Sequence, residues 1–386
     1  MSPTVLMSCT HHWTSPLQVG SHHLARRFVQ HGYEVAYISA PLTPLHFLRG
    51  PGADTAERFA LYRSGGRRFL GRKLWAYVPF ALIAPANRPL LRSGQVVRHW
   101  SKTAVPGLPG TAARNGFADV DVLYMDSIFQ PFWLRDLGYK KSVFRIMDNH
   151  SGFPGAGDTS RSVVKQIGSG ADLIAYSAAG LASYAAGLGC AKTVHVPNGI
   201  DFGMFASASR QMPAELRGIS GPIAVYAGAF DRWFDDRLLR QAARRLPHIS
   251  FVLIGPGSSS DQRFSGLPNV RLLGPVKHAE LPRYLYNCTV GIIPFNVDAY
   301  PDLINSVNPL KLYEYMACGL PVVATHWDEL ETIGSPAALC RGAEQFIQAL
   351  DEAVNRPPAP EDCIGFARGH DWETGFKTLL SALESV

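Results

Sequence analysis

The chain of 386 residues contains no run of about 18 consecutive apolar residues, the length that a membrane-spanning helix requires. Its best apolar stretch, Leu74–Ile83, is short and is interrupted by Pro79. The first residues, MSPTVLMSCTHHW, lack the basic and long apolar segments of a secretory signal peptide and are typical of an opening strand. We therefore expect a protein that is made and kept in the cytosol.

Motifs for metal, disulfide and dinucleotide chemistry are also missing. The histidine pairs His11-His12 and His22-His23 do not favour a metal site, because neighbouring side chains on a strand point to opposite faces. The GPG at 255–257 is not a GxGxxG motif, so a dinucleotide dehydrogenase has little support. No CxxC pair is present, so we expect neither metal nor cofactor, and free, mostly buried thiols at Cys9, Cys190, Cys288, Cys318, Cys340 and Cys363.

Acidic residues are scarce near the N-terminus. Residues 1–110 hold 13 Lys and Arg but only 3 Asp and Glu, a charge of +10, whereas the whole chain carries +6 and residues 111–386 therefore −4. Most of the excess lies between Arg49 and Lys102, mixed with aromatic residues and leucine, which suits an anionic bilayer surface. Nucleic acid is a rival partner, but no zinc finger, RNP or helix-turn-helix pattern supports it. A solvated basic face without a partner is the remaining alternative.

The chain does contain ample material for two globular domains, with 46% hydrophobic and 18% charged residues. Short β-rich runs alternate with helical segments in both halves, which predicts parallel sheets covered on both faces and an α/β fold. The runs are 4–9, 34–39, 120–125, 142–147, 172–177 and 193–196, then 223–228, 250–255, 270–274, 290–295, 321–325 and 336–340.

Domain boundaries follow from the turns between these runs. The segment VPNGIDFGMF, 196–205, is typical of a crossing between domains. We expect a first domain over residues 1–200 and a second over 201–365. We expect the final segment, 366–386, to pack its helix back toward the first domain. The stretch 41–115 is rich in Pro, Gly and Arg and receives no strand assignment.

The string NPLKLYEYMACGLPVVAT, residues 308–325, holds the strongest candidate site. Asn308-Pro309 is predicted to begin a helix, with Lys311 in its first turn and Glu314 three residues later on the same side. A helix N-terminus with a lysine suits a diphosphate, and Glu314 can accept hydrogen bonds from ribose hydroxyls. A surface Lys–Glu pair on an ordinary amphipathic helix is the simpler alternative.

Two other strand ends carry candidate residues. In YAGAFDRWFDD, 226–236, the backbone after Gly228 can approach a phosphate, and Arg232 can complement its charge; a plain turn with an exposed arginine is the alternative. In FRIMDNHSGF, 144–153, Asp148 directly follows an apolar strand. A carboxylate there can face a cleft between the domains and act as a general base, or simply cap the following loop.

A further candidate lies after the first strand. One of the pair His11-His12, with His12 preferred, is predicted to contact substrate, and Gly20 and Ser21 at the start of the next helix to approach a phosphate.

These strings resemble GT-B glycosyltransferases of the family 4 group. The resemblance rests on NPLKLYEYMACGLPVVAT, VYAGAF, VPNGID and the AELPRYLYNCTVGIIPF block, and is strongest over 196–340. It is closest to the membrane-associated glucuronosyltransferases of the xanthan type. The resemblance implies two Rossmann-like domains that face each other across a cleft. It also implies that Asp148 is the base, and that the donor contacts are Lys311, Glu314, Arg232, Gly228, Phe230, Phe295, Asn308 and Tyr313.

One departure bears on the stereochemistry. Many retaining relatives carry two glutamates with seven residues between them, and here Ser306 stands at the first position while Glu314 is the second. The missing carboxylate favours an inverting reaction, in which one base suffices.

The sequence thus predicts metal-independent transfer of a sugar from a nucleotide-sugar to a lipid-linked saccharide. The donor is expected to be UDP-linked, with UDP-glucuronate as one candidate. We expect the reaction to take place at the inner face of the cytoplasmic membrane, and we expect no nucleic-acid partner. Two alternatives stay open: a UDP-sugar epimerase of the same fold, and a non-catalytic module that binds sugar nucleotides or membranes.

Overall fold

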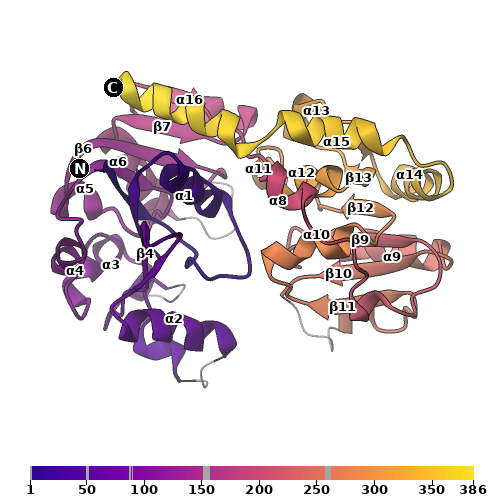
Figure 1. The fold of residues 1–386 in the computed structure, drawn as a ribbon, viewed down its shortest axis with the longest axis horizontal. Coiled ribbons are helices and arrows are strands. Elements are labelled where there is room, and N and C mark those ends of the chain that lie inside the picture. The colour runs from indigo at the N-terminus through magenta and orange to yellow at the C-terminus, as the bar shows by residue number, and fades with distance from the viewer. Residues whose placement is uncertain (1, 49–51, 87, 89, 151–156, 257–261) are drawn as a thin grey trace. The chain divides into compact units, whose positions relative to one another are not determined.

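The computed structural model describes the whole chain except residues 1, 49–51, 87, 89, 151–156 and 257–261 (Figure 1). The chain divides into two compact units, one of residues 1–197 with 375–386 and the other of residues 198–374. The first crossing therefore falls inside the VPNGID segment, after Pro197. The second crossing falls within the last helix, so residues 366–374 group with the second unit rather than with the chain end.

The first unit is built on an eight-stranded sheet in the order β3-β4-β2-β1-β5-β6-β7-β8. Neighbouring strands run parallel, except that β3 pairs antiparallel with β4 at one edge. Because the chain proceeds from β1 in one direction and returns to β5 on its other side, the strand order reverses between β1 and β5. The strands are β1 (Thr4–Ser8), β2 (Glu34–Ile38), β3 (Arg67–Phe69), β4 (Leu74–Tyr77), β5 (Asp119–Met125), β6 (Gly138–Ile146), β7 (Leu173–Tyr176) and β8 (Thr193–His195).

Helices pack on both faces of this sheet. Leu24 and Phe28 of α1 (Gly20–Gln30) are fully buried, and the Phe28 ring lies 4.8 Å from that of Phe376 on α16 (Trp372–Glu384). This contact holds the end of the chain against the first unit. The remaining helices of this unit are α2 (Ala53–Arg63), α3 (Gly94–His99), α4 (Leu108–Arg114), α5 (Trp133–Asp136), α6 (Asp158–Gly170) and α7 (Ala182–Ala186).

The second unit is built on a parallel sheet in the order β11-β10-β9-β12-β13-β14, whose strand order reverses between β9 and β12. Its strands are β9 (Ile223–Ala227), β10 (Ser250–Ile254), β11 (Val270–Gly274), β12 (Val290–Ile293), β13 (Val322–Thr325) and β14 (Ala338–Cys340). Its helices are α8 (Phe202–Ala206), α9 (Asp236–Arg245), α10 (Leu281–Leu285), α11 (Pro301–Ile304), α12 (Leu310–Ala317), α13 (Asp328–Ile333), α14 (Ala343–Asn355) and α15 (Pro360–Gly369).

The predicted α/β class with two parallel sheets is confirmed. All six cysteines are free, and four of them are buried, whereas Cys190 and Cys288 are half-buried. In the part of the chain that the structure describes, no helix combines the length and apolar character needed to cross a bilayer.

Candidate functional site

The candidate site in the second unit depends on how α12 is anchored. Tyr315 of this helix packs on Gly291 of β12 so closely that a Cβ at Gly291 would lie 2.2 Å from the tyrosine ring. The Tyr315 hydroxyl accepts a hydrogen bond from the backbone N–H of Ala227 at the end of β9, at 2.7 Å. The helix is therefore fixed over the point where the strand order reverses, which is where open α/β sheets bind ligands.

Lys311 lies in the first turn of this helix, between two aromatic rings. Its Nζ is 5.2 Å from the ring centre of Tyr226 and 4.9 Å from that of Phe295. Burial lowers the pKa of Lys311 to about 8, although the charge of Glu314 acts in the opposite direction. Among the described residues, no carboxylate or other acceptor forms an ion pair or hydrogen bond with this ammonium group. A buried cation that lies between ring faces and has no ion-pair partner among the described residues is suited to receive an anion from outside the chain.

Gly228 lies beside Lys311, with its backbone N–H bonded to the carbonyl of Ile254 at 2.8 Å. It follows β9 with a φ of 152°, and a Cβ there would lie 3.3 Å from Cε of Lys311. Gly255, which directly follows β10, packs against Gly228 more tightly still, because a Cβ at Gly255 would lie 1.9 Å from the carbonyl oxygen of Gly228. The structure thus brings Gly228 and Lys311 together, with no side chain of residue 228 between a ligand and the backbone.

Glu314 is buried and already has one partner. Its Oε1 lies 2.8 Å from Nε2 of His278, just before α10, and both side chains are about nine-tenths buried. The sequence interpretation placed Glu314 at the donor but overlooked His278. A histidine in a loop carries no local pattern that marks it as the partner of a carboxylate 36 positions away.

Asn308 and Tyr313 brace the start of α12 internally. The Tyr313 hydroxyl donates to Oδ1 of Asn308 at 2.9 Å, and the tyrosine side chain is 1% exposed. The carbonyl of Asn308 accepts from Nδ2 of Asn198 at 2.8 Å. Because the Tyr313 side chain has almost no accessible surface, the expected direct contact with a donor is not available to it.

Two residues after β9 are also expected donor contacts. Phe230 is largely buried, with its ring 5.7 Å from that of Tyr226, which flanks Lys311, and 5.6 Å from that of Phe234. Arg232 is exposed, and only its backbone N–H is bonded, to Oδ1 of Asp231. The loop leaves this guanidinium in solvent.

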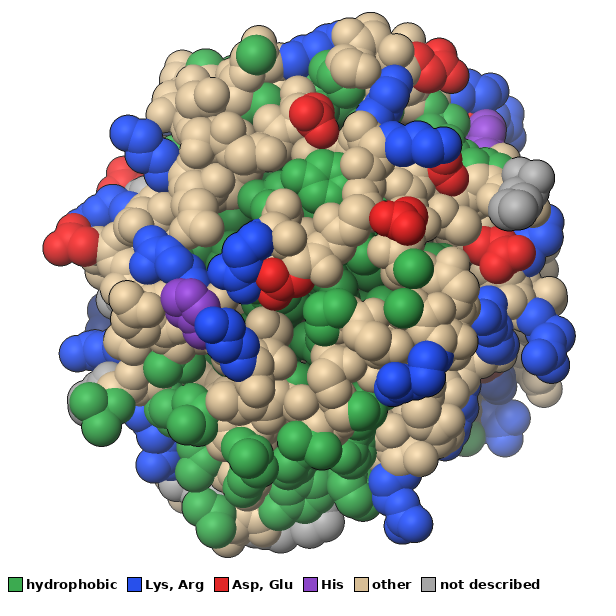
Figure 2. Space-filling view, turned by 90° about the vertical axis from the view of Figure 1, so that its left-hand side faces the viewer, with side chains coloured by type: hydrophobic (Ala, Val, Ile, Leu, Met, Phe, Trp, Pro, Cys, Tyr) green, Lys and Arg blue, Asp and Glu red, His purple; other side chains and the backbone are tan. Residues whose placement is uncertain are grey.

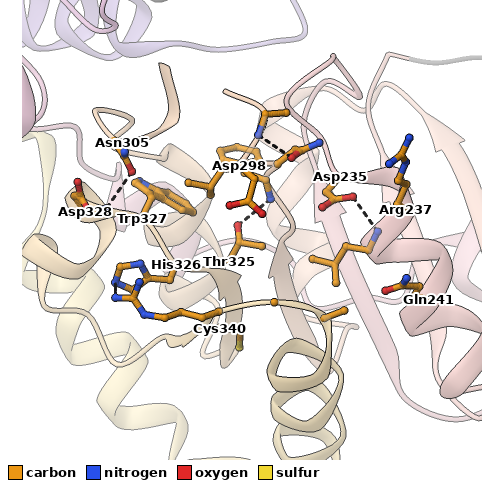
Figure 3. Close-up of a pocket in the computed structure, with 18 residues that line it drawn as sticks. Asp235, Arg237, Gln241, Asp298, Asn305, Thr325, His326, Trp327, Asp328 and Cys340 are labelled. Carbon is orange, nitrogen blue, oxygen red and sulfur yellow. Dashed lines mark hydrogen bonds between the residues drawn. The ribbon is translucent and has the colours of Figure 1, made fainter. Parts of the chain in front are cut away.

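A cavity of about 830 Å³ in the second unit has Phe295 among its lining residues (Figure 3). The Phe295 ring, which lies 4.9 Å from Nζ of Lys311, also stacks on the Trp327 ring at 5.4 Å. The cavity is formed where β12, β13 and β14 end and where α9 and α14 begin. Its polar lining includes Asp235, Arg237, Gln241, Asn296, Asp298, Asn305, Thr325, His326, Asp328 and Arg341.

In the first unit, Asp148 is half-buried just after β6. Burial raises the pKa of this carboxyl to about 6, close to the range in which a general base is effective. Part of the FRIMDNHSGF segment, residues 151–153, lies outside the described residues.

Asp126 was missed by the sequence interpretation. It follows β5, is 5% exposed, and both of its carboxylate oxygens lack a hydrogen-bond partner among the described residues. Burial raises its pKa to about 7, although the nearby hydroxyl of Ser21 and the charge of Arg145 on the neighbouring strand oppose the shift. Arg145 itself is fully buried, with Nη1 donating to the carbonyl of Val196. An aspartate directly after the run VDVLYM was the available signal.

The candidate phosphate contacts of the first unit surround the start of α1. Gly20 and Ser21 are its first two residues, both buried, and Oγ of Ser21 lies 3.2 Å from the hydroxyl of Tyr37. His12 is also buried, with Nδ1 3.0 Å from Oγ1 of Thr14 and Nε2 2.9 Å from Oδ1 of Asp54. The ring nitrogens of His12 therefore already have partners inside the first unit.

Two known family models match this chain, one in each of its two units. Residues 7–176 match the family model described as "Glucuronosyltransferase GumK, N-terminal domain", and residues 221–356 match "Glycosyl transferases group 1". Sucrose-phosphate synthase from Thermosynechococcus elongatus has a similar fold, with a TM-score of 0.71, 15% identity and coverage of 99% of this chain and 98% of that one. Anabaena HepE, solved with UDP-glucose, gives a TM-score of 0.64, 14% identity and coverage of 99% and 100%.

Two parallel α/β units of this kind define the GT-B class. The fold of this chain is that of the GT-B glycosyltransferases, and its two matched stretches are similar to a GumK-type N-terminal domain and to a group 1 glycosyltransferase domain.

Two curated relatives are similar over parts of the chain. TuaH of Bacillus subtilis (strain 168), assigned to teichuronic acid biosynthesis as a glycosyltransferase, is 32% identical over 48% of this chain and 49% of its own length. The UDP-glucuronate:glycolipid 2-beta-glucuronosyltransferase of Xanthomonas campestris pv. campestris is 28% identical over 33% of this chain and 30% of its own length. The chain thus spans at most about half the length of these relatives.

Proposed function

We propose that the protein transfers a sugar from a UDP-sugar to a lipid-linked saccharide, with inversion at the anomeric carbon and without a metal ion. UDP-glucuronate is the proposed donor. Its support is the name of the Xanthomonas relative, which transfers from UDP-glucuronate to a glycolipid. The match of residues 7–176 to a glucuronosyltransferase domain points to the same donor class.

The observation that carries the donor site is the Lys311 ammonium group, held between the rings of Tyr226 and Phe295 with no anionic partner in the described residues. A diphosphate next to Gly228 would supply that partner. Lys311 and the N-terminal amides of α12 would stabilise the charge that develops on the departing UDP, as preorganised donors do in other sites.

The proposed base is Asp148. Its carboxylate takes the proton of an acceptor hydroxyl, the acceptor oxygen forms a bond to the anomeric carbon, and the bond from that carbon to the diphosphate breaks. The bonding electrons leave with UDP. Ser306 supports the inverting course, because its hydroxyl donates to the carbonyl of Leu303 inside the fold and the position offers no second carboxylate.

The acceptor is proposed to arrive at a bilayer surface that the first unit binds. Leu82, Ile83, Leu90 and Val105 are 59%, 48%, 86% and 52% exposed, which is unusual for large apolar side chains. The pairing of Ala81 with Ala104 brings the segments around residues 82 and 105 together. Arg88, Arg92 and Lys102 are exposed nearby in sequence. Figure 2 shows hydrophobic side chains gathered on one face of the molecule, with Lys and Arg among and around them.

The first test is a thermal-shift panel with UDP-glucuronate, UDP-glucose, UDP-N-acetylglucosamine, GDP-mannose, free UDP and NAD. A ligand at about 100 times its dissociation constant adds roughly 2.7 kcal/mol of stability, which is readily measured. Stabilisation by UDP and by one UDP-sugar would support the proposal and identify the donor. If no nucleotide shifts the melting temperature, the donor site at Lys311 loses its support.

Transfer itself needs a second assay. The donor found in the panel is incubated with a membrane extract containing lipid-linked saccharides, with and without EDTA. Label in the lipid fraction, unchanged by EDTA, is the expected result. Conversion of the donor sugar in the absence of any acceptor would instead indicate an epimerase.

A further inference from the structure

The pair formed by His278 and Glu314 is the most deeply buried ion-pairing contact near Lys311. Nε2 of His278 lies 2.8 Å from Oε1 of Glu314, and the two side chains are 9% and 10% exposed. The histidine ring is held from the other side by Phe205, whose ring centre is 5.7 Å away at 65° to it. Because Glu314 cannot donate when it is ionised, Nε2 must carry the shared hydrogen.

This arrangement leaves one of the two carboxylate oxygens of Glu314 available to another hydrogen-bond donor. Oε1 is bonded to His278, and no hydrogen bond to Oε2 occurs among the described residues. Glu314 lies one helical turn after Lys311, on the same side of α12, and its charge acts on the Lys311 ammonium group. A carboxylate oxygen in this position is a hydrogen-bond acceptor close to the proposed diphosphate.

We propose that His278 is a positioning residue of the donor site, which holds Glu314 so that Oε2 accepts hydrogen bonds from the ribose hydroxyls of the nucleotide. This inference rests on the proposed function, because it requires a nucleoside diphosphate beside Lys311. The hydrogen bond from His278 withdraws charge from the carboxylate and fixes its rotamer. Without it, the free carboxylate would turn away or repel the neighbouring phosphates.

The test compares two nucleotides on one set of variants. Dissociation constants for UDP and for 2′,3′-dideoxy-UDP are measured by calorimetry on the wild-type protein, His278→Leu and His278→Gln. We expect His278→Leu to weaken the binding of UDP about tenfold and that of dideoxy-UDP less than about twofold, since dideoxy-UDP lacks the hydroxyls that Glu314 would bind. His278→Gln, which retains an N–H donor, should restore most of the UDP affinity.

The matched control is His248→Leu. His248 also pairs with a carboxylate of the second unit, Oδ1 of Asp351 at 3.3 Å, but this pair is on the surface and should not affect either nucleotide. A second series places His278→Leu in a Glu314→Gln background, where it should cause no further loss if it acts through Glu314.

The outcomes separate the two proposals. The inference is overturned if His278→Leu weakens the binding of UDP and of dideoxy-UDP equally, or if it lowers the UDP affinity further in the Glu314→Gln background. Either result would mean that His278 supports the fold in general. Wild-type protein that binds neither nucleotide would overturn the proposed donor site itself. If His278→Leu fails to fold, the other two variants decide: Glu314→Gln must discriminate less between UDP and dideoxy-UDP than wild type does, whereas His278→Gln must discriminate nearly as well as wild type, and any other result overturns the inference.

Discussion

Replacing Lys311 with methionine should raise the stability of the protein while removing its affinity for UDP. The side chain lies between Tyr226 and Phe295 with no ion-pair partner among the described residues, and burial lowers its pKa to about 8, although the charge of Glu314 opposes the shift. An ordinary lysine pKa is about 10.4, so the difference corresponds to roughly 3 kcal/mol of destabilisation at neutral pH. Methionine matches the length of the side chain, carries no charge, and its sulfur packs well against aromatic rings.

The sign of this effect depends on pH. The folded protein favours the neutral amine, so above about pH 10, where the unfolded chain is neutral as well, the lysine carries no penalty. The penalty grows as pH falls toward 8 and is complete at pH 7. Lys311→Met should therefore raise the melting temperature at pH 7, by about 2–4 °C for each kcal/mol, and the gain should be lost near pH 10.

Binding should change in the opposite direction. Removing one member of a buried charge pair costs about 2–5 kcal/mol, so the dissociation constant for UDP should rise at least about 30-fold. Calorimetry with UDP, paired with differential scanning of the free proteins, measures both quantities. Lys165→Met is the control, because this exposed lysine on α6 changes the net charge equally.

A single combination of results would refute the reasoning. If Lys311→Met melted several degrees below wild type and still bound UDP within about threefold, the lysine would be a structural element. Its place between the rings would then have no connection with a ligand.

Three further predictions follow from the structure. Asp148→Asn should reduce the rate of sugar transfer about 10²–10⁴-fold without lowering the melting temperature, and a near-normal rate in Asp148→Asn would exclude this residue as the base. The wild-type rate should fall as pH decreases through about 6, because the base becomes protonated there. UDP affinity of the wild-type protein should weaken above about pH 8, as Lys311 loses its proton, whereas Lys311→Met should show no such step. Leu90→Ser should weaken the affinity of the protein for phosphatidylglycerol vesicles about tenfold in a sedimentation assay. Met212→Ser, which changes a 45% exposed residue of the second unit, should leave this affinity unchanged.

Much of the fold could be predicted because the relevant signals are local. Each strand expected from a short apolar run is present, with ends shifted by a few residues, since hydrophobic runs buried on both faces are recognisable without knowledge of their neighbours. The stretch 41–115 was not predictable in this way. Leu74–Tyr77 becomes β4 only because it pairs with β2, in the register of Val35 with Leu74, and no local pattern specifies that partner.

The candidate site likewise combines residues that a local sequence pattern marks with residues whose properties depend on distant neighbours. Lys311 and Gly228 were recognisable as candidates because a lysine at a helix start and a glycine at a strand end each carry a local meaning. Asp126 follows an apolar run just as Asp148 does, but its burial among other strands, which raises its pKa, cannot be recognised from that local pattern. Phe230 and Tyr313 were assigned to the donor, and only the structure shows that both rings pack among core residues, since the packing of aromatic rings depends on neighbours distant in sequence.

The sequence by itself determined the alternation of strands and helices, the division into two α/β units and the presence of a cation at the start of α12. These depend on residue type and spacing along the chain. Only the tertiary structure decided that Lys311 lies between two rings and that His278 holds Glu314. It also decided that the Tyr313 hydroxyl is bonded inside the fold. The physical reason is that burial, pairing and the pKa of a group depend on atoms brought together from distant parts of the chain.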